Sequence, residues 1–127
     1  MSRITQLCFV DLYLSPKEAS FQLRDVHPQG WSELREEFPS RRFDTSELTE
    51  YLAICRQKAT ETLASETGES LKREAGFHWL SLSRGELHLY NIRHVQHHTG
   101  QLSAYLRRID EALQAPNAVR WIGTGWR

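Results

Sequence analysis

The stretch from Leu87 to Leu102, LHLYNIRHVQHHTGQL, holds four of the chain's six histidines within eleven residues. Its apolar residues recur at the three- and four-residue spacing of a helix. Just before it, Ser83 and Glu86 form a capping-box pattern, which is typical of a helix N-terminus. A proline two residues after Gln114 cannot continue a helix. The sequence therefore predicts one long helix from about residue 84 to about Gln114.

The four histidines of this helix fall into two groups on a helical wheel drawn at about 100° per residue. His94 and His98 lie at the centre of the apolar stripe, whereas His88 and His97 flank it on opposite sides. Side chains four residues apart on a helix are neighbours and can direct two ring nitrogens at one cation. His94 and His98 are therefore a candidate HxxxH pair for a divalent metal.

An inward histidine pair also has a structural interpretation. Imidazole rings are stable in a core when their nitrogens are hydrogen-bonded, here to Asp11, Asn91 or a tyrosine of a neighbouring helix. Neutral imidazole fits both interpretations. The spacing by itself leaves metal binding and core packing open.

Two further helices are predicted upstream. Residues 3–14 are apolar on almost every side, as in a helix inside a bundle, and this pattern stops before a Ser-Pro pair. Asp44 and Glu47 form a second capping box, ahead of a helix that we expect to end at Gly68. Between these helices, Ser15 is a candidate cap for a short helical turn. Residues 24–42 read as a long surface connection.

No strand pattern of comparable strength occurs, so the predicted fold class is all-α. The 127 residues suffice for one domain with a modest core, which we take to span residues 1–127. Sixteen basic residues balance sixteen acidic ones, which gives no reason to expect a nucleic acid or an anionic membrane as partner.

Cys8 and Cys55 lie in apolar-periodic segments and form no CxxC pair, which favours buried thiols in a reducing compartment. The apolar N-terminal segment is interrupted by Asp11, and no run approaches about eighteen apolar residues. We therefore expect no export signal and no membrane span, and a cytoplasmic location.

The stretch LYNIRHVQHHTGQLSAYLRR resembles the final helix of the DinB-like superfamily. DLYLSP, ELTEYLAICRQK and VRWIG are similar to other parts of that family, in the same order, so that the resemblance covers nearly the whole chain. It implies an all-helical bundle with up-down-down-up connectivity, usually dimeric. It also implies a divalent metal, commonly nickel or zinc, held by the two HxxxH histidines and one histidine of the second bundle helix. Several relatives are S-transferases that use small cellular thiols.

The chain departs from the family pattern in two respects. The first family helix has no counterpart, because MSRITQLCFVDLYLSP already corresponds to the second. The position of the remaining histidine ligand is occupied by Thr5, or by Gln6 with a one-residue error, and no histidine precedes His27. A histidine triad cannot be built from the matching positions.

Few residues can replace the lost ligand. On a wheel, Cys8 and Asp11 share a face with Ile4, and either side chain is a good zinc ligand. Each also has a plainer role, since a buried cysteine acts as a small apolar residue and an inward aspartate orients a neighbouring histidine. His27 and His78 lie in connections between the predicted helices, and could approach the histidine pair only from there. The predicted metal ligands are His94, His98 and Asp11.

A missing helix leaves an apolar face that monomers seldom expose. We expect a homodimer to bury it, residues 24–42 to fold over it, or an upstream helix to precede Met1. The resemblance implies a metal-dependent enzyme with a degenerate site, an S-transferase or hydrolase acting with a small thiol or other small molecule. The alternative is a non-catalytic bundle for dimerisation or partner binding, in which the HxxxH histidines are structural.

Overall fold

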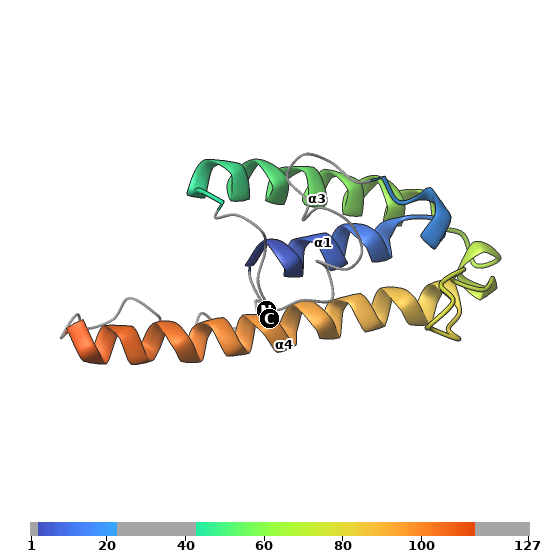
Figure 1. Ribbon diagram of the computed structural model, residues 1–127. Coiled ribbons are helices and arrows are strands. Elements are labelled where there is room, and N and C mark those ends of the chain that lie inside the picture. The colour runs from blue at the N-terminus through green and yellow to red at the C-terminus, as the bar shows by residue number, and fades with distance from the viewer. Residues whose placement is uncertain (1–2, 23–42, 114–127) are drawn as a thin grey trace, which may run out of the picture. The chain divides into compact units, whose positions relative to one another are not determined.

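The computed structural model describes residues 3–22 and 43–113 of the chain (Figure 1). Its three α-helices are α1 (Arg3–Leu14), α3 (Thr45–Ser65) and α4 (Arg84–Leu113), with short 3-10 helices at Glu18–Ser20 and Ser70–Lys72. Within these ranges the only β-structure consists of two isolated bridges between residues 74 and 83 and between 77 and 80. The all-α prediction is confirmed. None of the described helices is long and apolar enough to cross a membrane.

Local sequence signals set the starts of α3 and α4. At α3, the backbone N–H of Glu47 donates to Asp44 Oδ1 at 2.8 Å, and that of Asp44 donates to Glu47 Oε2 at 3.0 Å. At α4, Ser83 and Glu86 form the same reciprocal pair at 2.8 and 3.2 Å. Both predicted capping boxes are confirmed, because each needs only residues three positions apart.

Two predicted details are wrong. α3 ends at Ser65 rather than at Gly68, because the backbone leaves the helix at Glu66. The 3-10 turn that follows α1 begins after Lys17, with no side-chain cap, and not at Ser15. Ser15 has other partners, since its hydroxyl donates to the Asp11 carbonyl at 3.3 Å and accepts from Lys58 at 2.8 Å.

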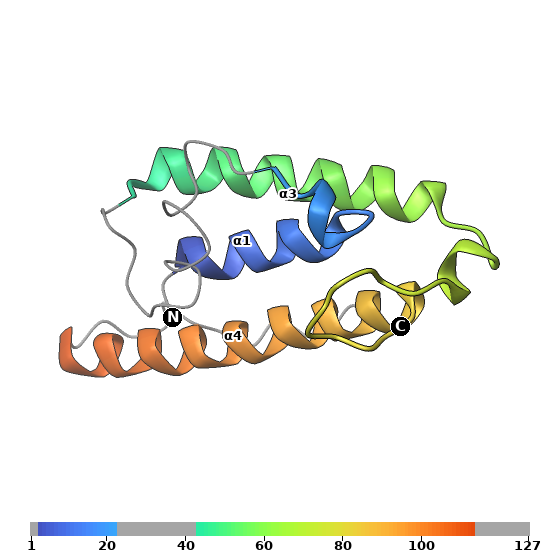
Figure 2. The same cartoon turned by 45° about the vertical axis from the view of Figure 1, so that its right-hand side comes forward.

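The described chain divides into two compact units, one up to His94 and one from Val95 onward. In the first unit, α1 and α3 lie side by side and run in the same direction, and α4 begins near the end at which both finish (Figures 1 and 2). The prediction of a single domain over residues 1–127 stays a prediction. The connection predicted for residues 24–42 lies outside the described residues.

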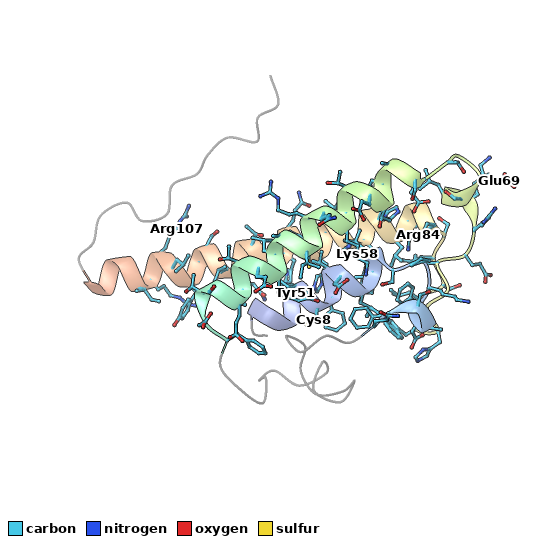
Figure 3. The ribbon with its side chains drawn as sticks, turned by 90° about the horizontal axis from the view of Figure 1, so that it is seen from above. Cys8, Tyr51, Lys58, Glu69, Arg84 and Arg107 are labelled. Carbon is cyan, nitrogen blue, oxygen red and sulfur yellow. The ribbon has the colours of Figure 1, made fainter. Side chains whose placement is uncertain are left out.

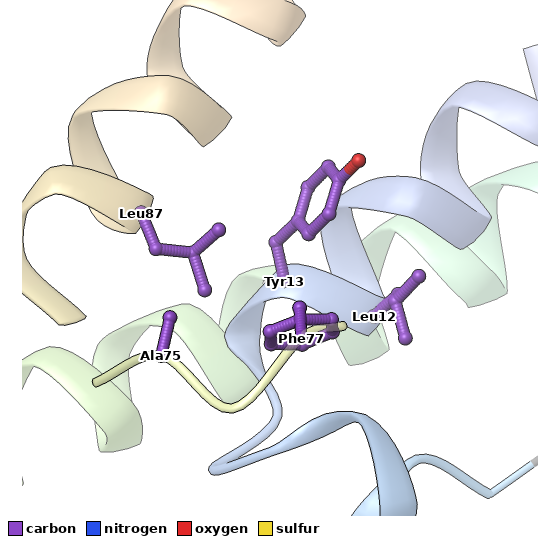
Figure 4. Packing of buried hydrophobic residues seen from close by; sticks show 5 residues of the cluster. All are labelled: Leu12, Tyr13, Ala75, Phe77 and Leu87. Carbon is purple, nitrogen blue, oxygen red and sulfur yellow. The ribbon is translucent and has the colours of Figure 1, made fainter. Parts of the chain in front are cut away.

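The core of the first unit consists of two apolar clusters. Cys8, Tyr51 and Cys55 are buried where α1 meets α3 (Figure 3). The second cluster joins α1, the start of α4 and the loop before α4, and contains Leu12, Tyr13, Ala75, Phe77 and Leu87 (Figure 4). Both cysteines are buried thiols, as the sequence predicted.

Gly76 allows the loop before α4 to pack against the segment after α1. Its φ is +76°, and a Cβ at this position would lie 2.9 Å from the Lys17 Cβ. A side chain here would meet both an unfavourable backbone conformation and a steric clash. The carbonyl of Gly76 accepts from the Glu18 backbone N–H at 3.2 Å, which holds the two segments together.

Candidate functional site

The carboxylate of Asp11 is the centre of a buried polar network between α1 and α3. Only 1% of Asp11 is exposed. The Tyr51 hydroxyl donates to Oδ2 at 2.8 Å, and the Lys58 ammonium lies 2.5 Å from Oδ1. Tyr51 and Lys58 are seven residues apart on α3 and therefore face the same side of that helix. The aspartate is inward, as predicted, and is neutralised by a lysine that the sequence did not single out.

Burial also controls the thiol and phenol beside Asp11. Loss of hydration raises the pKa of Cys8 to about 12, against a hydrogen bond with Tyr51 that acts to lower it. The pKa of Tyr51 is raised well above its ordinary value, first by burial and then by the nearby Cys8 and Asp11. Cys8 is therefore a protonated thiol at neutral pH and a poor nucleophile.

A second network, partly buried, surrounds the carboxylate of Glu66, just after α3. Arg84 Nε donates to Glu66 Oε1 at 2.9 Å, and His88 Nε2 lies 2.8 Å from the same oxygen. The Ser70 hydroxyl donates to Oε2 at 2.5 Å. Burial acts to raise the pKa of Glu66, but the hydrogen bonds from Ser70, Arg84 and His88 outweigh it and lower the pKa to about 2. The carboxylate is therefore ionised at neutral pH.

The guanidinium of Arg84 also binds the backbone at the end of α1. It donates to the carbonyls of Ser15 at 2.5 Å, Leu14 at 3.0 Å and Tyr13 at 3.4 Å. The last carbonyls of a helix have no partner within the helix, and its C-terminal end carries partial negative charge. Arg84, which belongs to α4, supplies both hydrogen-bond donors for these carbonyls and a positive charge at this end of α1.

Lys58 acts on the same end of α1. Its ammonium donates to the backbone carbonyl of Asp11 at 2.9 Å as well as to the Asp11 carboxylate. α1 has no basic residue in its own last turn. The lack of a basic residue in the last turn of α1 is the one signal in the sequence that a cation from another helix is needed there. It does not identify Lys58 or Arg84 as that cation.

His94 lies in the first unit, beside the aromatic side chains of α1. Its ring centroid is 5.6 Å from that of Phe9 and 6.2 Å from that of Tyr13, both in edge-to-face geometry. Burial raises the pKa of Tyr13 to about 12, so this phenol stays neutral. One helical turn before His94, the buried Asn91 donates to the Val10 carbonyl at 3.3 Å. The side of α4 that carries His94 thus packs against α1.

His98 belongs to the second unit and is buried. Its Nδ1 lies 2.7 Å from Gln101 Oε1. His97 is exposed, and its ring centroid is 5.0 Å from that of His98. His98 is buried, as predicted, and His97, which was predicted to flank the apolar stripe, is exposed.

The remaining ligand candidates differ in their surroundings. His78 is largely exposed and pairs with Glu18 Oε2 at 2.7 Å. The side chains of Thr5 and Gln6, and all of His27, lie outside the described residues. Over the described ranges, no three His, Cys, Asp or Glu side chains are grouped so that they could hold a metal ion. The predicted set of His94, His98 and Asp11 stays a prediction, and any metal at Asp11 would compete with Lys58.

Comparisons with protein-family models, with curated proteins and with solved structures found no match for the chain. The role of these residues must therefore be inferred from their own contacts.

Proposed function

We propose that this chain is a DinB-like, non-catalytic helical bundle that associates with a second copy of itself. In this proposal, Asp11, Glu66 and the histidines of α4 stabilise the fold. The observation that carries it is the exposed apolar pair Leu89 and Ile92 on α4, with 65% and 55% of their surface in contact with water. The two residues are three positions apart and so lie on one side of the helix.

The contacts of the buried charged groups support a structural role. Asp11 binds Lys58 and Tyr51, and Glu66 binds Arg84 and His88. A carboxylate that acts as a general acid or base must come within hydrogen-bond reach of the substrate, which here would require it to exchange one of its present partners for substrate. Here each carboxylate joins two helices, so such an exchange would disconnect the bundle.

The energetic argument for self-association is the cost of leaving apolar side chains in water. Burying apolar surface contributes about 25 cal/mol per Å². In a twofold-symmetric dimer the same patch is present on both copies, so Leu89 and Ile92 would contribute twice. A symmetric pairing of α4 with α4 is the simplest contact that buries both residues.

Sedimentation velocity over a range of protein concentrations tests this proposal. We expect the unmodified chain to sediment with the mass of two chains, and a Leu89→Gln, Ile92→Gln double variant to shift toward one. The matched control is Leu52→Gln with Leu63→Gln, two leucines of α3 that are exposed to a similar extent, 45% and 55%. This control should stay dimeric.

A monomeric unmodified chain at every concentration would contradict self-association. Equal dissociation of the α3 control would show that the α4 pair is not the contact. Circular dichroism of each variant separates dissociation from unfolding, because loss of helix would accompany only the latter.

A second candidate function is that of a metal-dependent S-transferase or hydrolase, and one observation favours it. His94 and His98 keep the HxxxH spacing, in residues that α4 spans without a break. A bound divalent metal with open positions lowers the pKa of a thiol or water. The described residues offer no group of three ligands, so tight binding would need a further ligand besides these histidines.

Incubation with nickel or zinc, followed by dialysis and metal analysis, tests this second candidate. Stoichiometric metal that is lost in His94→Ala, His98→Ala and kept in the exposed-residue control His97→Ala would support it. Loss of metal in Asp11→Asn would identify the third ligand. Retention of no metal by the unmodified chain would rule the candidate out, without affecting the proposed dimer.

A further inference from the structure

We draw no further inference here: the strongest candidate, the cavity of about 290 Å³ between the end of α1, the end of α3 and the start of α4, is lined by Glu66 and Arg84, which already bind each other and their neighbours, and nothing in the structure identifies a ligand for it.

Discussion

Two carboxylates hold the end of α1 in different ways. Asp11 belongs to α1 itself and binds Lys58 of α3, whereas Glu66 lies beyond α3 and binds Arg84 of α4. The ammonium of lysine is a single compact charge, and Lys58 reaches one backbone carbonyl of α1. The planar fork of arginine presents five donors, and Arg84 reaches three carbonyls as well as Glu66.

The difference shows that the two cations are not equivalent. Lys58 mainly neutralises a side chain, and about a quarter of its own side chain, 27%, remains exposed. Arg84 is buried and donates mainly to backbone carbonyls. Unlike a side chain, a backbone carbonyl cannot rotate to find another partner. We therefore expect the Arg84 network to contribute more to stability than the Lys58 network.

The largest effect is expected for Arg84→Ala. This change leaves Glu66 without the Arg84 guanidinium and removes the Arg84 donors to the carbonyls of Tyr13, Leu14 and Ser15. Of these carbonyls, that of Leu14 keeps the Thr62 hydroxyl at 3.5 Å. Removing one member of a buried ion pair costs about 3–5 kcal/mol. Urea unfolding, followed by circular dichroism, measures the loss.

The companion variant Arg84→Lys separates charge from geometry. Lysine keeps the positive charge but cannot reach the same set of acceptors, so its stability should lie between those of the unmodified chain and Arg84→Ala. If Arg84→Ala costs less than about 1 kcal/mol, the network is not what holds the end of α1.

A smaller effect is expected for Asp11→Asn. The amide is nearly the same size as the carboxylate and can still accept from the Tyr51 hydroxyl, but it does not neutralise Lys58. Hydrogen bonds to charged groups contribute about 1.5–3 kcal/mol, and the partial exposure of Lys58 lets its ammonium turn toward water. We expect a loss of about 2 kcal/mol by the same unfolding measurement.

Adding Lys58→Met to Asp11→Asn should recover part of that loss, because it removes the unpaired cation. A cost for Asp11→Asn that equals that of Arg84→Ala would break the comparison between the two networks. So would an absence of coupling between Asp11 and Lys58 in the double-mutant cycle.

The third predicted effect is a loss of stability that occurs only at acidic pH. The pKa of Glu66 is lowered from 4.5 to about 2 in the folded chain, so the ionised carboxylate contributes stability above pH 4.5. That contribution should be lost progressively as the pH falls from 4.5 toward 2, because protons bind the unfolded chain more readily. Thermal unfolding at several pH values measures the slope.

Glu66→Gln is the matched control for the acid effect. Its stability should depend less on pH between 4.5 and 2 than that of the unmodified chain, and it should be less stable at neutral pH. If the two slopes are identical, Glu66 is not the group responsible for the acid sensitivity.

The helices were predictable because their signals are local. The capping boxes at Asp44 and Ser83 each need one partner three residues away, and the bounds of α1 follow from an apolar segment that ends at a Ser-Pro pair. The end of α3 was misplaced: the backbone is already extended at Glu66, whose side chain binds Arg84, a partner eighteen residues away. No pattern within α3 reports that contact.

The polar networks were not predictable for the same reason. Lys58 and Arg84 have other charged residues close by in the sequence, and nothing in their neighbourhood marks them as partners of α1. Their partners on α1 lie 47 and 70 residues away. The inward positions of Asp11 and His98 followed from helical spacing, but spacing gives only the face of a helix and not the partner.

The helix at the beginning of the chain is completed by residues that come much later. The carbonyl of Asp11 accepts from Lys58 of α3 and that of Leu14 accepts from Arg84 of α4, so these tertiary donors to the last turn of α1 are synthesised long after it. A nascent chain that stops after α3 would contain Lys58 and Thr62, which donates to the Leu14 carbonyl at 3.5 Å, but would lack Arg84. The full set of donors to the end of α1 is present only once Arg84, the first residue of α4, has been added.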